Sequence, residues 1–136
     1  MTPVPTDSEL EILQVLWQNG SQTVRFVNET LNKLHTEKEI GYTTTLKFMQ
    51  LMLDKGLLTR AIIERSHIYS PAVPEEQTQE QLLKGFVDAA FRGSASSLVL
   101  RALGNGSTTQ ADLEKIKALI SEIEGNANNA NSIANL

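Results

Sequence analysis

Hydrophobic residues near the start of the chain recur at the spacing of a short amphipathic helix. The stripe consists of Leu10, Leu13, Leu16 and Trp17. Thr6 and Glu9 precede it at the spacing of a capping box, in which each side chain accepts a hydrogen bond from the backbone N–H of the other residue. Asn19-Gly20 follows the stripe and predicts the end of the helix. The apolar character of this segment indicates a buried helix.

Two more helices are predicted before residue 57. Thr23 is a candidate N-cap for the first of them, which carries an apolar stripe at Val24, Val27, Leu31 and Leu34. The polar stretch 35–41 is predicted to be a loop. The next helix begins near Tyr42 and ends at Lys55-Gly56, with an inward face made of Thr45, Phe48, Met49, Met52 and Leu53.

The hydrophobic period changes from helical to alternating after Gly56. Residues 58–65 alternate in a way that suits a strand, and residues 67–70 follow as an antiparallel return strand. The turn is expected near Arg65-Ser66, and Pro71 and Pro74 end the hairpin. Three helices followed by a small hairpin are typical of a winged helix-turn-helix domain.

From residue 75 to residue 124 the pattern is helical again, in three amphipathic pieces interrupted by Gly93 and by residues 104–106. These helices are too one-sided to enclose a core, so we expect a second copy of the chain to cover them. The residues expected at this homodimer interface are Leu82, Leu83, Phe86, Val87, Leu113, Ile116, Leu119 and Ile120. The Asn- and Ala-rich tail 125–136 is predicted to be disordered.

The predicted fold class is therefore mainly α with a small β-hairpin. We expect residues 1–74 to form a winged-helix domain, 75–124 to form helical dimerisation elements, and 125–136 to form the tail. The chain has 136 residues, of which 40% are hydrophobic and 21% charged, as expected for a globular protein. It has no apolar run long enough to cross a membrane and no signal peptide at its N-terminus, so we expect a cytoplasmic protein.

The sequence offers few signals of catalysis or of metal binding. It contains no cysteine, which excludes thiolate metal sites and cysteine nucleophiles. Its two histidines, His35 and His67, are not spaced as metal ligands, and the glycines form neither a phosphate-binding loop nor a dinucleotide fingerprint. We expect no enzymatic activity, no metal and no cofactor.

The third helix and the hairpin together suggest binding to double-stranded DNA. The first turns of the helix carry Tyr42, Thr43, Thr44 and Lys47, and this end of a recognition helix enters the major groove. The hairpin adds cationic or ionisable side chains that suit backbone phosphates, namely Arg60, Arg65 and His67. In a simpler interpretation, the threonines only cap the helix and Lys47 only contacts solvent.

A protein-interaction adaptor with a winged helix is the alternative function. The formal net charge of −4, from 12 Lys and Arg against 16 Asp and Glu, favours the adaptor. The exposed Leu51 expected on the outer face of the third helix favours it too. The threonines, Lys47 and the hairpin cations favour DNA.

Several motifs, in the same order, resemble the penicillinase-repressor (BlaI/MecI/CopY-like) family of bacterial regulators. They are the run 6–17 with Gly20 and Thr23-Val24-Arg25, then Tyr42-Thr-Thr-Thr45, Lys55-Gly56-Leu57-Leu58, Ile68-Tyr69-Ser70-Pro71 and the stretch 91–100. The resemblance covers roughly residues 6–124. It implies a homodimeric transcriptional repressor that binds an inverted-repeat operator, with the third helix, including Thr43, Thr44 and Lys47, as the recognition helix.

The sequence departs from that family at two places. Leu51 stands where relatives often carry an arginine on the outer face of the recognition helix. Relatives controlled by a membrane sensor protease are cut between Asn and Phe, whereas this chain has Arg101-Ala102 at that point. A sensor protease is thus a candidate partner, and Arg101-Ala102 is a candidate cleavage site of altered specificity.

Overall fold

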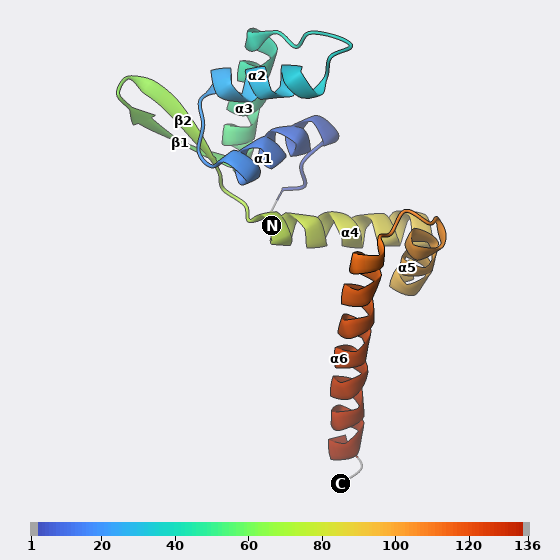
Figure 1. The fold of residues 1–136 in the computed structure, drawn as a ribbon. Helices are drawn as coiled ribbons and strands as arrows, with labels where there is room; N and C mark the ends of the chain where they lie inside the picture. Colours follow the sequence, from blue (N-terminus) through green and yellow to red (C-terminus); the bar gives the residue numbers. More distant parts are fainter. Residues whose placement is uncertain (1–2, 135–136) are drawn as a thin grey trace. The chain divides into compact units, whose positions relative to one another are not determined.

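The computed structural model describes the backbone of residues 3–134 and the side chains of residues 3–127. The chain divides into two compact units, Met1–Phe86 and Val87–Leu136. Figure 1 shows the first unit as three helices with a hairpin beside them, and the second as consecutive helices. The sequence-based boundary after residue 74 therefore falls too early, because the first twelve residues of helix α4 (Glu75–Phe91) belong to the first unit.

The first three helices begin and end close to the predicted positions. Helix α1 (Asp7–Asn19) has the complete capping box between Thr6 and Glu9, and helix α2 (Val24–Leu34) is capped by the Thr23 hydroxyl. Helix α3 (Tyr42–Lys55) ends at Gly56, whose φ of 84° lies in the left-handed region where glycine is not strained. Local caps thus fix most of these helix ends.

The hairpin consists of strands β1 (Leu58–Ile63) and β2 (Ser66–Pro71), paired antiparallel. Glu64 and Arg65 form the turn with φ angles of 49° and 68°, so the turn lies one residue before the predicted Arg65-Ser66. A two-residue turn with both residues at positive φ matches the twist of a hairpin. A bridge between Gln22 and Tyr69 joins the hairpin to the segment that precedes α2.

A single hydrophobic core lies inside the first unit. Its fully buried residues come from all three helices and from both strands, and they are Ile12, Leu13, Val15, Leu16, Val24, Val27, Leu31, Met49, Met52, Leu57, Leu58 and Tyr69. Val73 also belongs to this core, and its carbonyl oxygen accepts a hydrogen bond from Trp17 Nε1 at 3.0 Å. These contacts hold the exit of the hairpin against α1.

The second unit contains the end of α4, then helix α5 (Ala95–Gly104) and helix α6 (Gln110–Ala134). Ser94 caps α5, and the Thr109 hydroxyl accepts from the backbone N–H of Asp112 at the start of α6. None of the helices in residues 3–134 is long and apolar enough to cross a membrane.

The predicted disorder from residue 125 onward is wrong as far as Ala134, because α6 is helical to that residue. Residues 125–134 hold four Asn and three Ala. Asn and Gly cost at most about 1 kcal/mol per residue relative to Ala, and extending a helix that has already formed avoids the cost of nucleating a new one. No proline interrupts the segment. The last two residues, 135–136, lie outside the described part of the chain.

Candidate nucleic-acid interface

A groove of about 840 Å³ lies in the first unit between the start of α2, the start of α3 and the hairpin. Polar and charged side chains from all three elements line it, among them Arg25, Glu29, Tyr42, Gln50, Arg65 and His67. Three of these residues, Tyr42, Arg65 and His67, were predicted from the sequence as DNA contacts. The groove thus brings the start of α3 and the hairpin to one surface, whereas the other predicted contacts, Thr43, Thr44, Lys47 and Arg60, do not line it.

The first turns of α3 present the predicted recognition residues to solvent. Tyr42 is 50% exposed, and Thr43, Thr44 and Lys47 are exposed as well, whereas Thr45 is buried in the domain. Gly41 occupies the N-cap position, and no side chain accepts a cap hydrogen bond there. Thr43 and Thr44 therefore do not cap α3, against one part of the simpler interpretation, whereas the exposure of Lys47 agrees with both interpretations.

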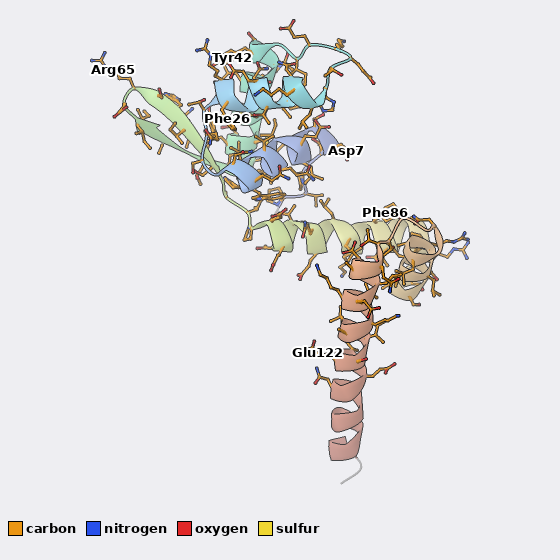
Figure 2. All side chains as sticks on the ribbon, in the orientation of Figure 1. Asp7, Phe26, Tyr42, Arg65, Phe86 and Glu122 are labelled. Atoms are coloured by element: carbon orange, nitrogen blue, oxygen red, sulfur yellow. The ribbon has the colours of Figure 1, made fainter. Side chains whose placement is uncertain are left out.

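The three hairpin residues predicted to contact DNA lie in two places, on one face of the hairpin and at its turn. Arg60 pairs with Tyr69 in the β-register, so its side chain stands on the same face as that groove residue. His67 lies across from Ile62 on this face and also lines the groove. Arg65 lies at the tip of the hairpin, where Figure 2 shows its side chain projecting away from the domain.

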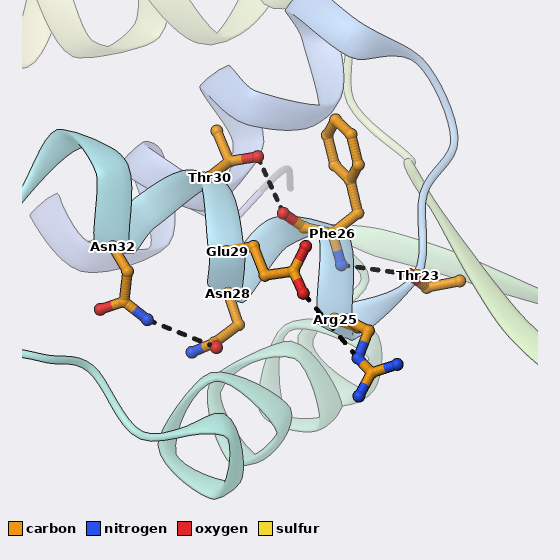
Figure 3. A network of polar contacts seen from close by, with 7 residues as sticks. All are labelled: Thr23, Arg25, Phe26, Asn28, Glu29, Thr30 and Asn32. Atoms are coloured by element: carbon orange, nitrogen blue, oxygen red, sulfur yellow. Dashed lines mark hydrogen bonds and ion pairs between the residues drawn. The ribbon is translucent and has the colours of Figure 1, made fainter.

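Most residues of the groove were not among the predicted DNA contacts, and the polar ones missed include Arg25, Asn28, Glu29 and Gln50. Arg25 Nε lies 3.9 Å from Glu29 Oε1 across one turn of α2, as Figure 3 shows. Both side chains are largely exposed, at 82% and 65%. Arg25 is the second residue after the Thr23 cap, so its place in the first turn of α2 was the available signal.

An amide network fixes the loop between α2 and α3. Asn32 accepts from the Ile40 backbone N–H through Oδ1 at 2.6 Å and donates from Nδ2 to the Ile40 carbonyl oxygen at 3.0 Å. Asn28 Nδ2 donates to the same carbonyl at 2.9 Å and to Thr45 Oγ1 at 3.0 Å. Asn32 also donates to Asn28 Oδ1 at 3.4 Å, a contact drawn in Figure 3. Helix α2 thereby holds the residue immediately before the α3 cap.

A second polar contact fixes the far end of α3. Glu9 is 2% exposed, and its Oε2 accepts from Lys55 Nζ at 2.8 Å. Burial alone raises the pKa of Glu9, but hydrogen bonds from Lys55 and from the Thr6 backbone, with the Lys55 charge, bring that pKa below its ordinary value. The ionised carboxylate therefore joins the start of α1 to the last turn of α3.

The residues predicted for dimerisation differ in exposure. Val87 is buried within its own chain, whereas Leu82, Leu113 and Ile116 are half-buried. The most exposed members are Leu83, Phe86, Leu119 and Ile120, each between 46% and 57%. Arg101 and Ala102 of the candidate cleavage site are both exposed on α5.

Comparison with known proteins places these features in a family. The model of the family described as "Penicillinase repressor" matches residues 5–122. The chain belongs to the penicillinase repressor family. The resemblance seen in the sequence motifs is thus confirmed, and the family consists of transcriptional repressors rather than enzymes.

The similarity extends along nearly the whole of the relatives. The penicillinase repressor of Bacillus licheniformis is 26% identical over 120 residues, which is 88% of this chain and 91% of that protein. The penicillinase repressor of Staphylococcus aureus is 22% identical and covers 85% of this chain and 90% of its own length. A solution structure of Bacillus licheniformis BlaI, a monomer in complex with the blaP half-operator, is 25% identical with a TM-score of 0.47, covering 56% of this chain and 89% of that one.

Proposed function

We propose that this member of the penicillinase repressor family represses transcription by binding an inverted-repeat DNA operator as a homodimer. The observation that carries the proposal is the groove, in which an exposed recognition helix and a cationic hairpin meet on one surface. A repressor acts where the DNA is, so the proposal includes a cytoplasmic location. Family membership favours this function over the protein-interaction adaptor.

Side chains that line the groove, and exposed side chains of α3 and the hairpin outside it, have separate roles in this proposal. Thr43 and Thr44 reach base edges in the major groove, where their hydroxyls form hydrogen bonds and their methyl groups contact thymine. Lys47 reaches guanine acceptors or phosphate from the next turn. The cations Arg25, Arg60 and Arg65 bind phosphates on either side of the recognition helix, and such contacts position a protein without specifying sequence.

The homodimer follows from the apolar stripes of the later helices. Leu83 and Phe86 of α4, and Leu119 and Ile120 of α6, remain about half exposed within one chain. A second copy of the chain would remove these side chains from water, and burial contributes about 25 cal/mol per Å² of apolar surface. The first unit of each chain, called the head below, would then bind one half-site of the DNA. Two heads joined through the later helices would bind two half-sites, which is the geometry that an inverted repeat requires.

A gel shift with the protein's own promoter region tests the proposal. We expect one retarded complex that survives an excess of unrelated DNA, with an affinity that falls as salt rises because phosphate contacts release counterions. A promoter fragment with one half-site scrambled is the matched control, and it should bind far more weakly. Equal binding to scrambled and intact fragments would contradict a sequence-specific repressor.

Release from DNA forms a separate part of the proposal. Proteolysis within α5 would cut dimerising helices from the DNA-binding head, and Arg101 and Ala102 are exposed there. A pocket shaped for the large apolar residue of an Asn-Phe site would be only partly filled by Ala102. We therefore propose that a sensor protease of altered specificity, or a mechanism without cleavage, relieves repression. Incubation with a family sensor protease and mass spectrometry of the fragments distinguishes the two.

A further inference from the structure

The start of α3 is held from outside the helix. An α-helix leaves its first N–H groups without partners inside the helix, and a side chain at the N-cap usually fixes this end. Gly41 at the N-cap has no side chain, and the structure shows no side-chain cap hydrogen bond. The first turn of α3 therefore depends on other contacts for its position.

The amides of Asn28 and Asn32 supply these contacts. Asn32 satisfies both the N–H and the carbonyl of Ile40, the residue directly before Gly41. Asn28 binds that carbonyl and also the hydroxyl of Thr45, in the first turn of α3 itself. The two asparagines are four residues apart on α2, so they stand on the same face of a rigid element.

The atoms that these amides hold lie next to the residues proposed to contact DNA. Tyr42, Thr43 and Thr44 fill the interval between the two anchored residues, Ile40 and Thr45. Hydrogen bonds to base edges form within about 2.7–3.2 Å and weaken steeply with poor angles. A small displacement of this turn would therefore break base contacts, while the flexible side chains of arginine and lysine could still reach phosphates.

We propose that Asn28 and Asn32 are positioning residues for DNA recognition. They hold the first turn of α3 in the position and orientation that its side chains need to contact base edges. This inference rests on the proposed function. It concerns specificity rather than general affinity, because the amides hold the backbone before α3 and the Thr45 hydroxyl. Asn28 also lines the groove, so the test uses Asn32 and Thr45, which do not line it. Loss of the network therefore lowers the preference for operator over unrelated DNA.

The variants Asn32→Ala and Thr45→Val test the proposal in the full-length protein. Thr45→Val keeps the buried volume and removes only the hydroxyl that accepts from Asn28. We expect operator affinity to fall about 5- to 20-fold in each variant, as for the loss of one or two hydrogen bonds. Binding to unrelated DNA and the salt dependence should match the parent, because no phosphate contact is lost.

Asn19→Ala is the matched control, because it removes an asparagine that donates to the Val15 carbonyl within α1. This variant should bind operator and unrelated DNA like the parent. Thermal unfolding confirms that all variants are folded at the temperature of the binding assay. Parent-like operator affinity in the folded variants, or an equal loss on both kinds of DNA, would overturn the proposal.

Hydrogen exchange separates this inference from the proposed function. The backbone N–H of Thr45 donates to the Gly41 carbonyl in the first turn of α3. We expect its exchange to be at least several-fold faster in Asn32→Ala than in the parent, without DNA present. If the parent does not bind its operator, the proposed function fails, and the exchange rate still shows whether the asparagines hold this turn. Unchanged exchange would overturn the inference even if the parent binds.

Discussion

The two units of this chain differ in what they bury and in what they expose. The first unit closes a core of aliphatic and aromatic residues and presents a polar groove to solvent. Among the described side chains of the second unit, only Val87 is classed as buried, and α5 has no buried residue. Its exposed surface carries large apolar residues instead, including Leu100, Leu119 and Ile123.

This difference shows how sequence pattern and assembly are related. A helix with one apolar face gains stability only when that face is covered. The head covers its helices with one another and with the hairpin, so its remaining surface is available for a polar ligand. The second unit leaves apolar faces uncovered, as expected when a second copy of the chain completes the structure.

Truncation after Phe86 should separate the two kinds of surface and produce the largest effect. We expect the fragment 1–86 to fold as a monomer, because it keeps the whole core. Its affinity for the intact operator should fall at least about 100-fold, since the second half-site no longer adds its contacts. Sedimentation and gel shift measure the two effects, with the full-length protein, proposed to be a dimer, as the reference.

A second truncation, after Pro74 instead of Phe86, tests whether the start of α4 stabilises the first unit. A fragment that ends at Pro74 lacks the start of α4, including Thr78, which is 1% exposed and donates to the Pro74 carbonyl. It should therefore be less stable than fragment 1–86. A full-length protein that sediments as a monomer at micromolar concentration would contradict the comparison between the units.

Substitution of one leucine in each unit should give opposite results. Leu16 is 1% exposed in the core, so Leu16→Ala should lower the free energy of unfolding by about 2–5 kcal/mol. Leu119 is 54% exposed, so Leu119→Ala should weaken self-association and leave the stability of the head unchanged. Urea unfolding of both full-length variants, followed by the fluorescence of Trp17 in the first unit, measures the stability of that unit, and sedimentation measures self-association. An equal loss of stability in the two variants would contradict the difference between the units.

Most of the head could be predicted from the sequence because its signals are local. The Thr6–Glu9 capping box, the Thr23 cap and Gly56 fix helix ends through contacts within a few residues. The change from a helical to an alternating hydrophobic pattern predicted the hairpin. Its turn residues are Glu64 and Arg65, and neither is the glycine or asparagine that usually identifies such a turn. The turn was therefore placed one residue late.

The groove could be predicted only in part, because it depends on contacts between distant segments. The exposed start of α3 followed from periodicity, but Arg25 and Gln50 joined it only through the packing of α2 against α3. The ion pair of Glu9 with Lys55 spans 46 residues, and no local pattern indicates it. The helix beyond residue 125 was missed because the Asn- and Ala-rich segment shows no usable periodicity, whereas a helix that has already formed extends at a small cost per residue.

Lys47→Ala should weaken DNA binding by the polar surface of the head without changing self-association of the chain. We expect a loss of about 1–3 kcal/mol in operator binding if Lys47 contacts a base, or a decrease of about one unit in the salt slope if it contacts phosphate. Fluorescence anisotropy at several salt concentrations distinguishes these outcomes. Lys33→Ala, an exposed lysine in the last turn of α2, is the control and should bind like the parent. If Lys47→Ala binds the operator like the parent, Lys47 does not contact DNA.

The ion pairs of the two units should also differ in strength and in pH dependence. Lys55→Met leaves the buried Glu9 carboxylate without its partner and should lower the free energy of unfolding by about 1–2 kcal/mol at pH 7, less than for a fully buried pair because Lys55 is half exposed. Lys117→Met removes an exposed pair with Glu114 in α6 and should cost at most about 0.5 kcal/mol.

The pKa of Glu9 sets the pH range of this effect. Because that pKa is lowered in the folded chain, its stabilisation is present above the ordinary value of 4.5 and is lost as the pH falls through the folded value. Lys55→Met loses this stabilisation, so the variant enters the acid range with a smaller free energy of unfolding than the parent, and its acid unfolding should begin at a higher pH. Circular dichroism along an acid titration measures the midpoint. A midpoint that moves as little as in Lys117→Met would show that the pair does not couple α1 to α3.

Glu29→Gln should produce the smallest change, and in the opposite direction to the other substitutions. Glu29 lines the groove and pairs with Arg25 at 3.9 Å, but both side chains are so exposed that the pair contributes little to stability. Removal of its negative charge should raise DNA affinity about 2- to 5-fold at low salt, through faster association and a gain that shrinks as salt rises. Stopped-flow association with labelled operator measures this. Glu122→Gln, an exposed carboxylate of α6, removes the same charge from the second unit and should change association much less. Equal effects of the two variants would indicate that the net charge of the protein, rather than the charge in the groove, determines the rate of association with DNA.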